Sequence, residues 1–381
     1  MKKIIKSFAI AAAGVFLTFS LISADESCEK APAAYVLMEA ETHSVLEGKN
    51  EDMRLNAGYL SKLMGLLLIA DDIDSGEYGL TDIVTASDNV KNTKGSVVWL
   101  ESGDEMSVEE LLKSVIIGNA NDAMTVLAER SSGSVEQFVM DMNAKAFDLG
   151  LRDTVFVSPY GYYNEKEYTT AHDTAIICSE LAEHECLLPY FSTWRDFVKN
   201  GRTELVSENT LTRTYERHIG FKACHSAESG FCIAEGARNE KGTTFIAIAL
   251  GAENESVSFG CAKKLLKSGF RGYKVLPTVF LEEMMKPLDI RNGVASSVEL
   301  TLASQGAAAV PKAAGELRAR VVIPDYISAP VKERQKVGTA AFYNEDTLVY
   351  ETDIITKTAV DRLDWCYVFK NTLYKMIRNK S

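Results

Sequence analysis

The sequence has 381 residues, 46% of them hydrophobic, and a formal net charge of −12 at pH 7. This length suits two domains better than one, and the hydrophobic fraction is sufficient for a sizeable core. So acidic a chain repels a phosphate backbone, which excludes nucleic acid as an expected partner.

The first 24 residues have the layout of a secretory signal peptide. Three lysines precede an apolar run over residues 8–22, and the small residues Ser23 and Ala24 follow. We expect cleavage after Ala24, which leaves an exported chain of 357 residues with a net charge of −15. The alternative is a retained membrane helix, but the run is shorter than the roughly 20 residues that a membrane span needs.

The next segments predict a hairpin and then a helix. Residues 34–47 alternate apolar and polar side chains on both sides of a turn at residues 42–44, which indicates a β-hairpin. Residues 60–70 form a strongly apolar helical segment. Asp, Ser and Gly in residues 71–79 are expected to end this helix.

Three further helices are indicated by their ends. Ser107 and Glu110 form a capping box that opens a helix running toward residue 117. A second helix is expected over residues 120–129. Ser134 is expected to cap a third, which ends at Gly150.

The remainder of this region predicts strands followed by a helix. The expected strands are residues 218–224, 230–237 and 243–250, and residues 261–270 form an amphipathic helix. Clustered helices together with late antiparallel strands indicate an α+β domain, which we place at residues 25–280.

A small all-β domain is expected over residues 281–356, because short alternating runs follow one another there with no helix between them. The runs are residues 298–302, 317–323, 338–343 and 347–352.

The tail, residues 357–381, is basic and rich in aromatic and aliphatic side chains, with a net charge of +4. An amphipathic helix of this composition suits the surface of an anionic membrane. A helix docked on its own protein is an equal alternative.

The cysteines and histidines give weaker indications. All seven cysteines follow the expected cleavage point, and an odd number cannot pair completely within one chain. Mostly buried thiols are expected, with a Cys224–Cys232 disulfide as an alternative. The histidines have no metal-ligand spacing, and no phosphate-binding or dinucleotide motif is present, so we expect no metal and no cofactor.

Several segments, in order along the chain, resemble the low-molecular-mass penicillin-binding proteins, which are serine D-alanyl-D-alanine carboxypeptidases. They are residues 33–52, 95–129, 133–161, 168–175 and 323–355. The last segment resembles the C-terminal β domain of that family, and the basic tail resembles its membrane anchor. The resemblance implies a β-lactamase/transpeptidase-like fold for the first domain and a location on the outer face of the cytoplasmic membrane.

The first motif of the family is Ser-x-x-Lys at the start of a helix. The spacing places the lysine one turn after the nucleophilic serine, so that the amine can take the hydroxyl proton. The resemblance places Lys62 at the lysine position and Tyr59 at the serine position. Ser61 precedes the lysine by one residue, which is the wrong spacing for the nucleophile.

The second motif, Ser-x-Asn, falls on Asn119-Ala120-Asn121. Asn121 matches the amide that binds substrate. Asn119 replaces the hydroxyl of the proton relay, and an amide cannot pass a proton as a hydroxyl does.

The third motif, Lys-Thr-Gly, falls on Lys222-Ala223-Cys224. Lys222 matches. Ala223 lacks the hydroxyl that holds the substrate carboxylate, and Cys224 places a side chain where glycine admits the substrate backbone. The family builds its oxyanion hole from backbone N–H groups, which are expected here at Tyr59 and His225.

Two other nucleophiles deserve comparison. A helix N-terminus and Lys62 would both favour the phenolate of Tyr59, but the tyrosine ring would occupy the place of the scissile carbonyl. Cys224 adjoins His225, yet neighbours on a strand point to opposite faces, which disfavours cysteine–histidine catalysis.

We therefore predict a non-catalytic relative that binds peptidoglycan stem peptides or a cell-envelope protein, with Lys62, Asn121 and Lys222 as polar lining of the old cleft. One alternative is a working carboxypeptidase, transpeptidase or other wall hydrolase that uses altered residues. Another is a structural or interaction protein whose cleft is closed and binds no ligand.

Overall fold

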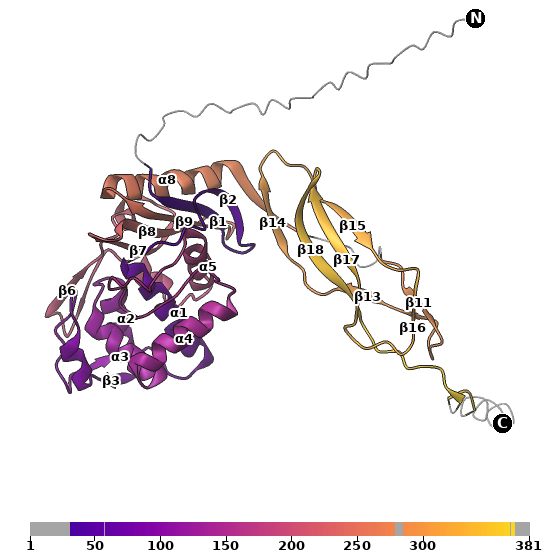
Figure 1. Cartoon of the computed structure of the whole chain (residues 1–381), viewed down its shortest axis with the longest axis horizontal. Helices are drawn as coiled ribbons and strands as arrows, with labels where there is room; N and C mark the ends of the chain where they lie inside the picture. Colours follow the sequence, from indigo (N-terminus) through magenta and orange to yellow (C-terminus); the bar gives the residue numbers. More distant parts are fainter. Residues whose placement is uncertain (1–30, 57, 279–284, 366, 370–381) are drawn as a thin grey trace, which may run out of the picture.

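The computed structural model describes residues 31–56, 58–278, 285–365 and 367–369. Figure 1 shows a rounded body of helices and strands, followed by an elongated body of strands that ends near the C-terminus. This arrangement confirms the predicted α+β first part and β-rich second part. The predicted signal peptide lies outside the described residues.

An antiparallel sheet of five strands, in the order β2-β1-β9-β8-β7, forms the centre of the first body. Its strands are β1 (Ala34–Glu39), β2 (Ser44–Lys49), β7 (His218–Ser226), β8 (Gly230–Arg238) and β9 (Thr244–Ala252). The predicted hairpin is confirmed as β1 and β2, and the three later strands are confirmed within a few residues. Strand β7 is an edge strand.

Helices cover both faces of this sheet (Figure 1). Helix α8 (Glu255–Gly272) packs with β8 and β9, and its core includes Ala223, Ile233 and Leu266. A larger core on the other face joins the sheet to the remaining helices. These are α1 (Lys62–Ser75), α2 (Val108–Ile116), α3 (Asn121–Ser132), α4 (Val135–Asp148) and α5 (Ala171–Leu181).

The predicted helix starts are confirmed by their caps. The Ser107 hydroxyl accepts the backbone N–H of Glu110, and the Ser134 hydroxyl accepts that of Gln137. The predicted end of the first helix within residues 71–79 is confirmed, since α1 ends at Ser75 and Gly76 closes it in the left-handed conformation.

Tertiary partners hold the acidic residues near the end of α1. Asp71 pairs with Lys145 at 2.8 Å, and Asp74 pairs with His184 at 2.7 Å. Because these acidic residues have ion-pair partners elsewhere in the chain, the helix continues past them as far as Ser75.

Short elements complete the first body, and most of them carry no clear sequence pattern. They are the 3₁₀ helices η1 (Gly58–Ser61) and η2 (Asp88–Asn92), helices α6 (Leu188–Phe191) and α7 (Leu211–Thr214), and the two-stranded sheets β3 (Ile83–Thr85) with β4 (Glu105–Ser107) and β5 (Arg195–Val198) with β6 (Thr203–Val206).

The second body is built from three small sheets around a core that includes Leu288, Phe342 and Ile354. Their orders are β13-β18-β17-β15, β12-β11-β16 and β10-β14. The strands are β10 (Tyr273–Pro277), β11 (Leu288–Arg291), β12 (Ser297–Val298), β13 (Leu300–Leu302), β14 (Ala307–Pro311), β15 (Arg318–Val322), β16 (Tyr326–Ser328), β17 (Lys336–Asn344) and β18 (Thr347–Thr356).

The predicted boundary at residue 280 falls in residues 279–284, outside the described ranges. Strand β10 precedes that boundary, yet it pairs with β14 of the second body. At the other end, Val360 is buried and forms a β-bridge with Val331. The residues just after 356 therefore pack on the β unit, and the projecting tail begins later.

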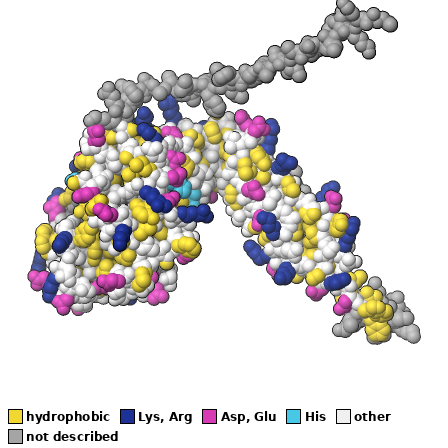
Figure 2. Space-filling model, in the orientation of Figure 1, with side chains coloured by type: hydrophobic (Ala, Val, Ile, Leu, Met, Phe, Trp, Pro, Cys, Tyr) yellow, Lys and Arg dark blue, Asp and Glu magenta, His cyan; other side chains and the backbone are white. Residues whose placement is uncertain are grey.

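Several apolar side chains of the tail are exposed to solvent. Trp365 is 81% exposed and Phe369 59% exposed, and Figure 2 shows hydrophobic side chains gathered at this tip of the molecule. Within the described ranges, no helix has both the length and the apolar character needed to cross a membrane.

Candidate functional site

The three damaged motifs come together between η1, the start of α3 and the edge strand β7. A Cβ atom placed on Gly58 would lie 3.6 Å from the Cys224 sulfur. One placed on Gly95 would lie 3.1 Å from the Asn121 amide nitrogen and 3.9 Å from the Tyr59 hydroxyl. The structure therefore brings together residues that are more than 160 positions apart in the sequence.

Tyr59 lies on η1, immediately before α1, with its ring turned against Lys62. The Lys62 ammonium nitrogen is 4.6 Å from the ring centroid, over the face of the ring and not at the hydroxyl. Burial raises the pKa of Tyr59, with a smaller contribution from Tyr162. The expectation that Lys62 and the helix start favour the phenolate is therefore wrong, because desolvation outweighs them.

Lys62 is completely buried and donates a hydrogen bond to the Tyr160 carbonyl oxygen at 2.9 Å. Burial lowers the pKa of Lys62 well below its ordinary value, and the positive charge of Lys222 lowers it further. A lysine with a lowered pKa can act as a base, so the site keeps a candidate base without a serine hydroxyl beside it.

The second motif keeps its amide in a tight contact. The Asn121 amide donates to the Lys94 carbonyl oxygen at 2.5 Å and to the Tyr162 hydroxyl at 3.2 Å. Asn119 adopts a φ of 58° and is 6% exposed. The side-chain oxygens of both asparagines are buried without a hydrogen-bond partner among the described residues.

Lys222 points inward from β7 and closes the C-terminus of α2. Its ammonium donates to the carbonyl oxygens of Val115 at 2.9 Å and Ile116 at 3.2 Å. A cation is favourable at this end of a helix, where carbonyl groups lack intrahelical partners. Burial nevertheless lowers the pKa of Lys222 to about 8.

Cys224 fills the space that glycine leaves open in the family motif. Its side chain faces η1, and its thiol forms hydrogen bonds with Cys232 and with the Leu60 backbone. The hydrogen bond with Cys232 and burial raise the pKa of Cys224. Cys224 and Cys232 are directly opposite each other in the β7–β8 register, yet no disulfide joins them in this structure.

Little space remains beside the second and third motifs. The cavity next to Asn119, Lys222 and Ala223 has a volume of about 10 Å³, at the limit for a single water molecule. The loop before α5 lies directly against Tyr59, since a Cβ on Gly161 would be 2.8 Å from the Tyr59 Cα atom. The side chains of Lys62, Asn121 and Lys222 are therefore packed against other residues of this chain.

Sequence reasoning missed the residues that close the site. Glu167 is 5% exposed, accepts the Ser61 hydroxyl at 2.7 Å and has a pKa raised by burial. The Tyr160 carbonyl oxygen accepts a hydrogen bond from Lys62, and the Tyr162 hydroxyl accepts one from Asn121. Asp122 accepts the backbone N–H groups of Val98 and Leu100 at 3.1 and 2.9 Å. Only Asp122 had a sequence signal, its place beside the second motif.

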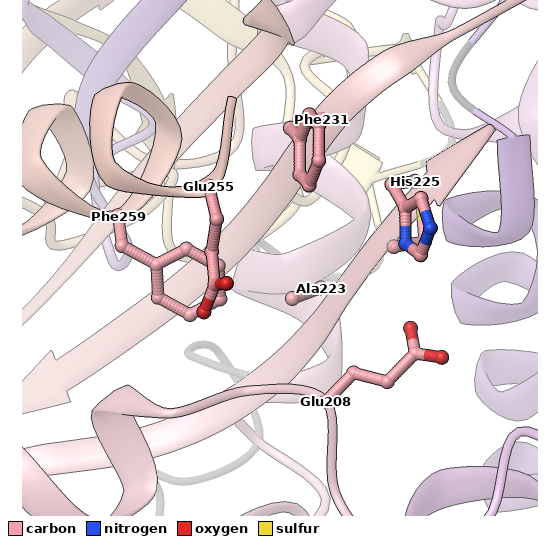
Figure 3. A pocket seen from close by; sticks show the side chains of 7 residues that line it. Glu208, Ala223, His225, Phe231, Glu255 and Phe259 are labelled. Atoms are coloured by element: carbon pink, nitrogen blue, oxygen red, sulfur yellow. The ribbon is translucent and has the colours of Figure 1, made fainter. Parts of the chain in front are cut away.

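A separate cavity of about 220 Å³ opens on the other face of β7, around Ala223. Its lining also includes Glu208, Cys224, His225, Phe231, Glu255 and Phe259, so Cys224 reaches its edge (Figure 3). Within the described ranges, no group of three or more histidine, cysteine, aspartate or glutamate side chains is arranged to hold a metal ion.

Two family models match the chain: D-alanyl-D-alanine carboxypeptidase over residues 22–254 and the C-terminal domain of penicillin-binding protein 5 over residues 282–362. The carboxypeptidase DacF of Bacillus subtilis is 30% identical over 344 residues, which cover 89% of this chain and 88% of DacF. DacC of Escherichia coli is 27% identical, covering 94% of this chain and 92% of DacC.

The fold is shared with solved structures as well. Penicillin-binding protein 5 from Haemophilus influenzae superposes with a TM-score of 0.80 at 23% identity. The match covers 89% of this chain and all of that protein.

Proposed function

The chain belongs to the D-alanyl-D-alanine carboxypeptidase family, and we propose that it is a non-catalytic member, which binds peptidoglycan stem peptides or a cell-envelope protein outside the cytoplasmic membrane. The observation that carries the proposal is Tyr59 at the position of the nucleophilic serine, with the Lys62 amine over its ring and not at its hydroxyl.

The other substitutions support a loss of catalysis by the same physical reasoning. A substrate would have to displace the Cys224 side chain from η1, and the cavity beside Asn119 and Lys222 has a volume of only about 10 Å³. The retained Lys62, Asn121 and Lys222 already bond to carbonyl or hydroxyl oxygens of this chain. A ligand would gain little from them, because each would exchange an existing hydrogen bond for a new one.

A binding role requires a surface outside the old cleft. The cavity around Ala223 is open to solvent and lies on the strand that carries the third motif. The exposed tail supplies a second contact, with the membrane surface. Together these features favour a binding protein at the cell wall over a purely structural protein.

The experiment is intact-mass spectrometry of the mature protein after incubation with excess penicillin, joined to an assay for D-alanine release from a peptide ending in D-Ala-D-Ala. Acylation requires a nucleophile, a base and an oxyanion hole, and the first is missing. We expect no mass increase and no D-alanine. A stoichiometric adduct mapped to Tyr59, Ser61 or Cys224 would instead establish the alternative of a working enzyme.

A further inference from the structure

The cavity around Ala223 is a small concave site whose walls come from three parts of the chain. Strands β7 and β8 contribute Ala223, Cys224, His225 and Phe231. The start of α8 contributes Glu255 and Phe259, and the segment before α7 contributes Glu208. Its volume of about 220 Å³ is below the range typical of drug-sized ligands, so it fits one side chain of a larger molecule.

The charge of this cavity is negative. Both glutamates are exposed, and Figure 3 shows their carboxylates facing the space beside Ala223. No lysine or arginine is among the described residues that line it. Glu255 lies in the first turn of α8, where the positive N-terminus of the helix offsets part of its charge. Glu208 interacts electrostatically with Lys62 and Lys222, but both lysines are buried and neither lines the cavity. A carboxylate ligand would be repelled here and a cation attracted.

The remaining walls are aromatic. The rings of His225 and Phe231 stack with centroids 5.1 Å apart and an angle of 12° between their planes. Phe259 lies on the α8 side of the cavity (Figure 3). Flat apolar walls of this kind pack against an aliphatic chain, and aromatic faces attract a cation at its end.

From this combination we propose that the cavity binds an ammonium group at the end of an aliphatic side chain of a peptide. The inference deepens the proposed binding role and rests on it. Position 223 in the resembling family holds a substrate carboxylate through a hydroxyl. Here Ala223 lacks that hydroxyl, and Glu208 and Glu255 make the site favour a cation instead of a carboxylate. The diamino acid of a wall stem peptide and the lysine of an envelope protein both present such a group.

The test uses a fluorescent tripeptide, L-Ala-γ-D-Glu-L-Lys, labelled at its N-terminus, and its Nε-acetyl-lysine counterpart. Anisotropy titrations with the mature chain should show binding of the free amine and at least about tenfold weaker binding of the acetylated peptide, a factor that corresponds to about 1.4 kcal/mol. The double variant Glu208→Gln/Glu255→Gln should lose this preference. Glu240→Gln, an exposed neutralisation in the turn between β8 and β9, should retain it.

An all-L peptide containing lysine distinguishes the two sources of the amine. Tighter binding of the γ-linked peptide assigns the wall stem, and tighter binding of the all-L peptide assigns a protein partner. Equal binding of free and acetylated amines, no binding of either at millimolar concentration, or the same loss in Glu240→Gln overturns the inference. Penicillin acylation does not depend on this amine preference, so failure of the two proposals can be told apart.

Discussion

The two faces of strand β7 have diverged in opposite directions. On the face of β7 that packs against α2 and η1, Lys222 and Cys224 are 3% and 4% exposed. Both form hydrogen bonds with other residues of this chain. Toward α8, Ala223 and His225 line an open cavity. Because side chains alternate along a strand, adjacent substitutions have closed one face and opened the other.

This contrast underlies the proposed function, which places binding on the open face of β7 and not at the three motifs. The closed side of the site keeps Lys62, Asn121 and Lys222. Their side chains donate hydrogen bonds to backbone carbonyl groups of this chain and so stabilise the fold. The open face and the exposed tail keep their polar and apolar groups available to other molecules. In the proposed function, the loss of chemistry and the gain of a binding surface both involve neighbouring positions on strand β7.

The largest expected effect comes from reversing the closed face. The quadruple variant Tyr59→Ser, Asn119→Ser, Ala223→Thr and Cys224→Gly restores the nucleophile, the relay hydroxyl, the carboxylate contact and the substrate path. We expect partial acylation by penicillin, measured as an intact-mass increase. Removal of a nucleophilic serine costs about a millionfold in a serine protease, so the recovery should be far above background.

The single variant Tyr59→Ser is the matched control. It still has Asn119 in the relay and the Cys224 sulfur against η1, so little acylation is expected. If the single variant reacted as fast as the quadruple one, the cleft would be open in solution and the contrast between the two faces would fail.

The next prediction is that the exposed tail binds an anionic membrane. Residues 365–381 carry four basic side chains and no acidic one. Attraction of about 1 kcal/mol per basic residue to an anionic surface predicts strong binding to vesicles containing phosphatidylglycerol. Co-sedimentation should fall to background when residues 365–381 are deleted, and neutral vesicles should bind neither form. Equal binding with and without the tail would disprove this role.

Glu235 sharpens the comparison because it lies on β8, opposite Phe221 of β7, and is fully buried. Asn209 donates to one carboxylate oxygen at 2.5 Å, and the other has no partner among the described residues. Burial raises the pKa of Glu235 to about 8. The folded protein therefore binds one more proton than the unfolded chain between the ordinary glutamate pKa and about 8.

The contribution of Glu235 to the free energy of unfolding therefore falls as the pH rises through that interval. Glutamine mimics the protonated acid, so Glu235→Gln should match the parent near pH 4 and exceed its free energy of unfolding near pH 8. The expected gain is on the order of 4 kcal/mol as an upper limit. Urea unfolding at both pH values measures it. Parallel pH dependences for parent and variant would show that Glu235 is ionised in the folded state.

The sequence was sufficient for the fold and for the location of the motifs. The apolar runs of β1, β8 and β9 and the caps at Ser107 and Ser134 are local signals, and the structure retains them. The sequence located the end of α1 only within residues 71–79, because Lys145 and His184, which hold Asp71 and Asp74, come from other parts of the chain.

The state of the site was less accessible to sequence reasoning. The residues at the predicted motif positions lie near one another in the fold, but their packing depends on Tyr160, Tyr162 and Glu167, whose contacts are long-range and follow no spacing rule. The cavity around Ala223 likewise needs α8, more than 30 residues later in the chain. The substitutions show which functional groups are absent from the motif positions. Which side chains pack in their place depends on tertiary contacts that the sequence does not reveal.

The smallest effect concerns Cys224 and Cys232 on the closed face. They lie opposite each other and are 4% and 1% exposed, and the structure holds them as thiols. Burial should protect both from a maleimide added to the native protein, while the partly exposed Cys186 and Cys261 react. After denaturation without reductant, all seven thiols of the mature chain should react. A count of five, with Cys224 and Cys232 recovered as one disulfide-linked peptide pair, would show that the closed face is cross-linked and would restore the alternative left open by the sequence.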